Sequence, residues 1–366
     1  MKKTLVCCCL FCAALGGALF AYTERNGVIT FKMGSVIPDN TAWGKALRDA
    51  EREWARVSNG KVKLQILPDS RAGDEYQMIQ KMDNGTLDAA VLSSFGLNAI
   101  TKKNRNVVTN RASTPSTAII TLSCPFLIQD EEELDIVLKG IKPDLEAKIK
   151  EKGYFPLAWS RVGWIKLFSK TPVRKPDDLR KLSLGSGTGE EEIKSVFERL
   201  GFKLRLKEQK DLLTGLTTND IQAVYQSPIA VLGAQIVGVA PNMTNLLISP
   251  FMGGIVFSQK SWDAIPVEYR QKLIDVTAKI ADRLDGAIKQ LEADSIEQAR
   301  KALKGKFNVI ELSDAEKQAW YSTIDDALTG KEGQTGLIGT VFDKAIYDKV
   351  KGIVTAYRQG QGAQRR

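Results

Sequence analysis

Apolar residues recur along this chain with two periods, and their succession predicts β-strands separated by α-helices. Residues 30–36 and 61–67 alternate between apolar and polar side chains, as strands with one covered face do. A second helix is expected over 73–84, with Tyr76 facing inward, and a short apolar strand over 87–93. This order predicts parallel strands joined by crossover helices, which is an α/β fold. The first helix of this succession lies between the strands 30–36 and 61–67. Its apolar stripe consists of Trp43, Leu47, Ala50, Trp54 and Val57.

The second half of the chain repeats this succession and then changes to one long helical pattern. Residues 155–159 and 164–169 predict two strands where the chain crosses to a second lobe, and 245–249 and 254–258 predict two strands that return. From Pro266 to Leu303 an apolar stripe continues without an internal proline. A helix of that length measures about 55 Å at 1.5 Å per residue. Because this exceeds the diameter of a small lobe, the helix is expected to pass along both lobes.

The N-terminus has the layout of an export signal. Lys2 and Lys3 precede an uncharged apolar run that ends at Ala21. We therefore predict that residues 1–21 are a signal peptide or an N-terminal anchor, because the run is close to the ~20 residues that span a bilayer. The predicted location is the periplasm, with a tether to the cytoplasmic membrane if the signal is not cleaved. At the other end, residues 359–366 are expected to be disordered.

The composition narrows the possible chemistry. The chain contains no histidine, and Cys124 is the one cysteine beyond the signal. Ser-His-Asp and Cys-His catalytic sites are thereby excluded, and so are metal sites built from histidine. We expect no cofactor and no metal, and we expect Cys124 to be a buried apolar residue. The net charge of +9 is spread among acidic residues, which favours solvated helix faces over a nucleic-acid site.

Short motifs along the mature chain have an order and spacing that point to one family. They are Phe31-Lys32-Met33-Gly34, Trp43-Gly44, Ser58-Asn59-Gly60, Gly73-Asp74-Glu75, Asn84-Gly85-Thr86-Leu87-Asp88, Pro125-Phe126-Leu127, Gly153-Tyr154, Gly163-Trp164, the segment 172–179, Leu212-Leu213-Thr214-Gly215-Leu216 and the segment 221–225. With these motifs the chain resembles the solute-binding subunits of TRAP (tripartite ATP-independent periplasmic) transporters, of the DctP type. The resemblance covers most of the mature chain.

The resemblance implies a two-lobed clamshell of the periplasmic-binding-protein kind, with a long helix spanning both lobes. We place lobe I at 28–157 plus about 246–284, and lobe II at 158–245 plus about 285–345. Such a protein captures a solute between its lobes and delivers it to a TRAP membrane permease driven by an ion gradient. Some receptors of the family also work with a tetratricopeptide-repeat partner, so such a partner is conceivable here. No enzymatic turnover is expected.

The sequence departs from the family at its ligand-anchoring positions. The resemblance implies an arginine at the end of the strand after the Pro-x-Asp-Leu motif, where this chain has Gly185. A second position that is often basic is Ile165. A carboxylate is gripped best by the two-pronged guanidinium of arginine. We therefore expect a rather apolar ligand, with Arg161 and Lys166 as the nearby cations that could replace the missing arginine.

The predicted ligand-binding residues lie at strand ends or on loops that face the cleft. The alternative for each aromatic residue among them is simple packing in the core or between the lobes. The turn 185–189 resembles a phosphate-binding loop, but the three glutamates that follow it would repel a phosphate. The predicted set is Trp43, Phe95, Trp159, Arg161, Trp164, Gly185, Ser186, Tyr225, Gln226 and Phe251.

Two other classes of function compete with solute transport. One is an enzyme on the same scaffold that uses carboxylates such as Asp39 or Asp74. The other is an interaction protein or lipid carrier that keeps the clamshell but no longer binds a typical organic acid. The missing arginine makes the second alternative the stronger of the two.

Overall fold

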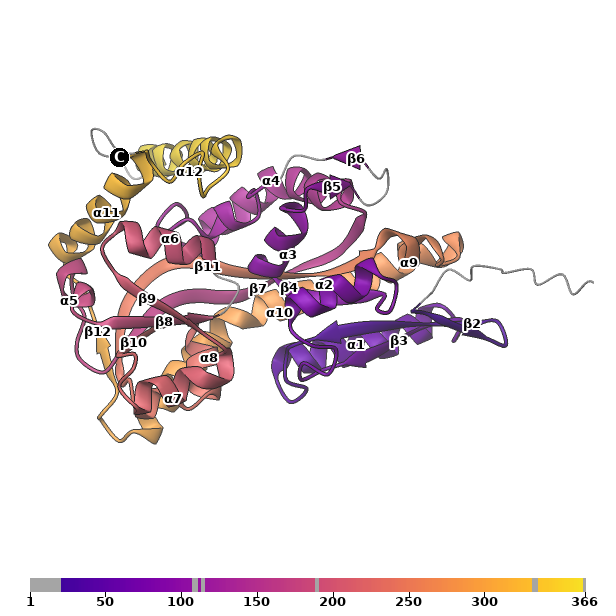
Figure 1. The fold of residues 1–366 in the computed structure, drawn as a ribbon, viewed down its shortest axis with the longest axis horizontal. Coiled ribbons are helices and arrows are strands. Elements are labelled where there is room, and N and C mark those ends of the chain that lie inside the picture. Colours follow the sequence, from indigo (N-terminus) through magenta and orange to yellow (C-terminus); the bar gives the residue numbers. More distant parts are fainter. Residues whose placement is uncertain (1–20, 107–110, 113–115, 188–190, 331–334, 365–366) are drawn as a thin grey trace, which may run out of the picture.

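One mixed sheet forms the centre of the molecule and continues through both lobes (Figure 1). The computed structural model describes residues 21–106, 111–112, 116–187, 191–330 and 335–364. The strand order is β1-β2-β4-β11-β7-β10-β8-β9, with β3 paired to β2 and β12 to β11. The strands are β1 (Thr23–Arg25), β2 (Val28–Ser35), β3 (Val62–Leu67), β4 (Ala89–Ser93), β5 (Arg105–Asn106), β6 (Arg111–Ala112), β7 (Tyr154–Ser169), β8 (Ser183–Gly187), β9 (Lys203–Lys207), β10 (Ala223–Gln226), β11 (Asn242–Ser258) and β12 (Asn308–Ile310).

Helices cover the sheet in both lobes. In Figure 1, α1 and α2 lie at the end that carries β2 and β3, whereas α6, α7 and α8 lie at the end that carries β8 and β9. The helices are α1 (Ala42–Val57), α2 (Glu75–Asp83), α3 (Ser94–Thr101), α4 (Glu131–Glu151), α5 (Pro176–Arg180), α6 (Glu191–Arg199), α7 (Leu212–Thr217), α8 (Pro228–Gly233), α9 (Gln259–Asp263), α10 (Val267–Ala302), α11 (Asp314–Thr329) and α12 (Lys344–Gln364). This arrangement confirms the α/β class and the two-lobed architecture expected from the sequence.

Two long antiparallel strands, β7 and β11, connect the lobes. They pair from Ser169 opposite Asn242 to Tyr154 opposite Ser258. The sequence predicted two separate strands in each of these regions, and this prediction was wrong. The register shifts between Thr244 and Ser249, between Phe251 and Met252, and between Ile255 and Val256. These irregularities are accommodated as bulges, so pairing resumes after each interruption. The predicted lobe boundary at 157/158 falls within β7.

The long helix α10 contributes to the cores of both lobes, as predicted. Its first half places Leu273 and Ile280 in the core around Trp54. Its last turns place Ala299 in a different core, around Phe168. With 36 residues, α10 is about 54 Å long at 1.5 Å per residue. The helix therefore packs against both lobes and connects their cores.

A buried hydrogen bond fastens α10 to the first lobe. The Trp54 indole donates to Thr277 Oγ1 over 2.9 Å, and the indole also stacks on Phe257. We predict that Thr277→Val lowers the free energy of unfolding by about 2 kcal/mol, because the indole N–H loses its partner in the core. Urea denaturation followed by fluorescence measures the loss. Thr217→Val is the control. The hydroxyl of this exposed threonine donates to the Leu213 carbonyl four residues earlier, as the Thr277 hydroxyl donates to the Leu273 carbonyl. Equal losses for both variants would contradict the prediction.

Helix α2 begins with a capping box that orients the residues behind it. Asp74 accepts from the Gln77 backbone, and the Gln77 side chain accepts from the Asp74 backbone. With this start, Met78, Ile79 and Met82 are the buried residues of α2. Tyr76 was predicted to face inward, but it is 46% exposed. The helix begins after Asp74 instead of at Gly73, and Tyr76 points to the side that α3 approaches.

The structure tests the prediction for the C-terminal end of the chain but not the one for the N-terminal end. Helix α12 continues to Gln364, so the predicted disorder of 359–366 is wrong over its helical part. No proline interrupts this segment, and alanine and glutamine continue the helix. The predicted signal or anchor lies almost wholly outside the described residues, which begin at Ala21. Among the described helices, none combines the length and the apolar character that a membrane span requires.

Candidate functional site

A large cavity lies between the lobes and has a volume of about 1560 Å³. The first lobe contributes residues from the start of α1, the start of α2, and β4 with α3. The second lobe contributes Tyr225 and Gln226 at the end of β10 and Ile229 and Ala230 on α8. Helix α10 closes one side with residues such as Ile280. This is the place that the clamshell predicts for a ligand, at the carboxyl ends of strands and between two lobes.

Six of the residues that the sequence singled out line this cavity. Phe95 and Phe251 form one wall, with ring centroids 6.0 Å apart. Tyr225 is buried, and its hydroxyl shares a hydrogen bond of 2.9 Å with Ser249 Oγ. The six are Trp43, Phe95, Trp159, Tyr225, Gln226 and Phe251. Whether they touch a ligand stays a prediction.

The other four predicted residues are not among those that line the cavity. For Arg161, the ion pairs of its side chain explain this. Its guanidinium is engaged by three carboxylates of the chain itself: Glu131 at 2.6 Å, Asp135, and Asp285 at 3.7 Å. The backbone N–H of Arg161 also donates to Asp285. With its side chain 17% exposed, Arg161 joins α4, β7 and α10 at the lobe junction.

Trp164, Gly185 and Ser186 also lie in packed surroundings. The Trp164 indole donates to Glu131 Oε1 over 2.5 Å, and its ring is 2% exposed. A Cβ atom at Gly185 would collide with the side chain of Ile221 and lie 3.2 Å from Leu212. This position of β8 therefore faces the core of the second lobe and has no room for a long side chain. Ser186 is fully buried, and residues 188–189 of the predicted phosphate-type turn lie outside the described part of the chain.

Lys166, the other predicted substitute cation, is buried and faces away from the cavity. Its ammonium donates to Asn245 Oδ1 over 2.9 Å. Burial lowers the pKa of this lysine, while the carboxylates of Glu292 and Glu311 oppose the shift. Lys166 therefore serves the contact between β7 and β11, and Ile165 beside it lines the cavity.

Most charged side chains on the cavity wall form hydrogen bonds or ion pairs with other residues of the chain. Asp74 caps α2, which is a structural role for one of the carboxylates considered for catalysis. Glu75 accepts from the backbone N–H and the hydroxyl of Ser93, both over 2.8 Å, and burial raises the pKa of its carboxyl group. Of the described residues on the wall, Lys210 alone is cationic, and it pairs with Glu208 at 2.7 Å.

One polar atom of the cavity wall lacks a partner. The indole nitrogen of Trp159 is buried, and no described residue accepts a hydrogen bond from it. A buried donor without a partner costs free energy. Because the nitrogen itself is not accessible from the cavity, it offers no contact to a ligand in this conformation. Sequence reasoning singled out the ring of Trp159 but had no signal for this donor. It also missed the aliphatic wall of α8 and α10, because helical spacing does not distinguish a cavity face from a core face.

The middle of β7 contacts α10 through a buried carboxylate. Gly163 has φ +118°, and a Cβ atom there would lie 2.7 Å from Glu292 Oε1. The same oxygen accepts from the Trp164 backbone over 2.9 Å. Burial raises the pKa of Glu292 to about 7; the Trp164 N–H and Lys166 oppose this shift, and Glu131 adds to it. A glycine is needed at this point because a left-handed backbone conformation brings β7 against the carboxylate.

Comparison with known proteins identifies the relatives of this chain. The family model DctP, described as bacterial extracellular solute-binding protein family 7, matches residues 33–331. The 2,3-diketo-L-gulonate-binding periplasmic protein YiaO of Escherichia coli K12 is 26% identical over 221 residues, which are 59% of this chain and 62% of YiaO. The C4-dicarboxylate-binding protein DctB of Bacillus subtilis 168 is 22% identical over 89% of this chain and 93% of its own.

Solved structures agree on the fold. A TRAP periplasmic solute binding protein from Sulfurospirillum deleyianum, with bound succinate, has a TM-score of 0.75 at 16% identity and covers 88% of this chain and 98% of its own. One from Xanthobacter autotrophicus Py2, with bound β-D-galacturonate, has a TM-score of 0.72 at 20% identity and covers 88% and 99%. Since the family model spans most of the sequence, the chain belongs to the DctP family of bacterial extracellular solute-binding proteins.

Proposed function

We propose that this receptor captures a small, rather apolar ligand between its lobes and delivers it to a TRAP permease. Members of the family bind a solute and do not convert it, so the chain is not an enzyme. The apolar character of the ligand is what would distinguish this chain from a receptor for small dicarboxylates.

The chemistry of the cavity wall carries this proposal. Among the described residues on it there is no arginine, and its lysine is paired with a glutamate. Arg161, which the sequence offered as a substitute cation, is engaged by three carboxylates instead of being available to a ligand. A small dicarboxylate left without such cations would lose its hydration without adequate replacement. Aromatic and aliphatic walls instead favour a ligand with a sizeable apolar body.

The ligands named for the relatives are acids or sugar acids: 2,3-diketo-L-gulonate for YiaO, succinate and β-D-galacturonate for the two solved structures. We infer that the ligand of this chain shares the location between the lobes but has a larger apolar part.

Closure of the lobes is expected to accompany capture. The cavity volume of about 1560 Å³ exceeds the ~300–1,000 Å³ typical of small-molecule sites. A hinge in the lobe-connecting strands β7 and β11 would reduce this volume around the ligand. One register shift between these strands lies between Phe251, on the cavity wall, and Met252.

Native co-purification tests the proposal. The mature chain is purified without added ligand and denatured, and released small molecules are identified by mass spectrometry. We expect a fatty or aromatic compound, bound about one per chain. The variant Phe251→Ala removes one cavity wall and should weaken binding of the compound about thirtyfold, since a buried phenyl ring contributes about 2 kcal/mol.

Two outcomes would contradict the proposal. Release of a small dicarboxylate or sugar acid would show that the chain grips an acid without the usual arginine. Finding no compound, together with no thermal shift across panels of organic acids and lipids, would favour the alternative of an interaction protein or lipid carrier on this scaffold. The tetratricopeptide-repeat partner and the membrane tether stay predictions from the sequence.

A further inference from the structure

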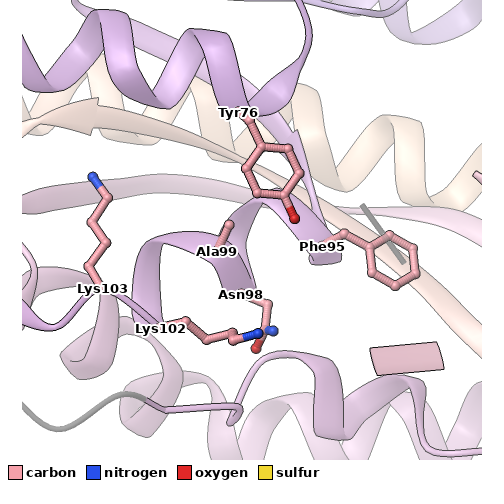
Figure 2. A pocket seen from close by; sticks show the side chains of 6 residues that line it. All are labelled: Tyr76, Phe95, Asn98, Ala99, Lys102 and Lys103. Atoms are coloured by element: carbon pink, nitrogen blue, oxygen red, sulfur yellow. The ribbon is translucent and has the colours of Figure 1, made fainter. Parts of the chain in front are cut away.

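A second, smaller cavity of about 200 Å³ opens next to the large one (Figure 2). Tyr76 and Phe95 line both cavities, so these two rings form the border between them. The remaining wall comes from the C-terminal half of α3 and the residues just after it: Asn98, Ala99, Lys102 and Lys103. This volume is sufficient for a carboxylate and a few water molecules, because one water molecule takes up roughly 30 Å³ in the liquid.

The spacing along α3 explains how these side chains come together. Phe95, Asn98, Ala99 and Lys102 recur every three or four residues, so they lie on one face of the helix. Figure 2 shows Tyr76 reaching across from α2, with its hydroxyl toward the space between Phe95 and Asn98. The exposure of Tyr76, which the sequence had predicted to be buried, is what creates this arrangement.

The wall of the small cavity offers mainly hydrogen-bond donors. Two of its residues are lysines, and none of the described residues that line it is acidic. The charge of Lys103 is balanced behind the cavity, where its ammonium lies 2.5 Å from Asp83 Oδ2 and 2.5 Å from the Tyr154 hydroxyl. Lys102, which is exposed, brings a second ammonium to the wall. Ammonium, hydroxyl and amide groups around an apolar border are suited to the charged end of an amphipathic molecule.

We propose that this small cavity is the subsite for the carboxylate of an amphipathic monocarboxylic acid, whose apolar body lies in the large cavity. The acid would pass between Tyr76 and Phe95, with its carboxylate beside Lys102 and its body against Phe95 and Phe251. This inference rests on the proposed function and names its ligand class. It also explains how a receptor of this family can hold an acid without the arginine that is absent at Gly185.

Paired probes test the subsite. Octanoate and 4-phenylbutanoate are compared with octan-1-ol and 4-phenylbutan-1-ol by isothermal titration calorimetry on the mature chain stripped of bound ligand. We expect the acids to bind roughly tenfold more tightly than the alcohols, because a hydrogen bond to a charged group contributes about that factor. Lys102→Met should abolish this difference by weakening the acids alone, and Lys102→Arg should restore it.

Substitution of Lys102 is compatible with the fold. Its backbone N–H caps α3 by donating to Asn98 and Ile100, and this contact does not involve the side chain. Lys344→Met on α12 is the control for loss of one surface charge, since Lys344 pairs there with Asp348. If acids and alcohols bind equally, or if Lys102→Met leaves acid binding unchanged, the subsite is refuted while the apolar site stands. If none of the probes binds, the proposed function fails with it.

Discussion

Arg161→Met should lower the free energy of unfolding of the ligand-free protein by about 3 kcal/mol, because it leaves three carboxylates facing one another at the lobe junction. In the wild-type chain the guanidinium lies between Glu131, Asp135 and Asp285, and Arg161 is 17% exposed. Removing one partner of a largely buried ion pair is costly because the remaining charges keep their desolvation penalty without compensation. Chemical denaturation followed by tryptophan fluorescence measures this loss.

Arg56→Met on α1 is the matched control. Arg56 also bonds to a carboxylate, that of Glu53, but its side chain is 67% exposed, and we expect little change in stability. The experiment separates two roles for Arg161. A structural role predicts the loss of stability without ligand, whereas the ligand-binding role considered from the sequence predicts unchanged stability and weaker binding. The second pattern would contradict the assignment made from the structure.

Glu292→Gln should remove a pH dependence of stability of about 3 kcal/mol between pH 4.5 and 7. Burial raises the pKa of Glu292 from 4.5 to about 7, so over this interval the folded chain holds a proton that the unfolded chain has released. The stabilisation is complete below pH 4.5 and is lost as the pH rises to 7. Glutamine keeps an oxygen for the Trp164 N–H and does not titrate.

Denaturation at pH steps from 4 to 8 checks this prediction. The stability of Glu292→Gln should rise relative to the wild type as the pH increases. Other carboxyl groups whose pKa is raised by burial, those of Glu75, Asp88 and Asp285, affect both proteins and cancel in the comparison. Glu297→Gln, on the same helix and half exposed, is the control. Parallel curves for the wild type and Glu292→Gln would show that folding does not raise the pKa of Glu292.

The sequence predicted the elements of this fold well where periodicity was strong. The stripe through Trp43, Leu47 and Trp54 became α1, and the long stripe from Pro266 became α10. Periodicity failed in β7 and β11, where the alternation lapses at residues that form bulges. A break in a pattern marks either the end of a strand or a bulge within it, and only the partner strand decides between them.

The candidate site was predicted in part: six of the ten predicted residues line the cavity, and Arg161, Trp164, Gly185 and Ser186 do not. Aromatic residues such as Phe95, Trp159 and Phe251 were expected at the cleft and line the cavity. Arg161 was considered as a ligand cation, but Glu131, Asp135 and Asp285 approach it from sequence positions far away. Linear sequence cannot show which carboxylates surround a cation, since ion pairs form between elements that the fold brings together.

By itself, the sequence determined the α/β class, the two lobes joined by a shared helix, and the family, because these depend on periodicity and on motifs in a fixed order. It also determined that no arginine stands at residue 185. Only the tertiary structure decided that no long side chain fits there, that Arg161 is held by three carboxylates of the chain and Lys166 by Asn245, and that Tyr76 borders a second cavity. The reason is physical: packing and charge pairing are set by distances between elements, and these distances exist only once the sheet and α10 have brought the two lobes together.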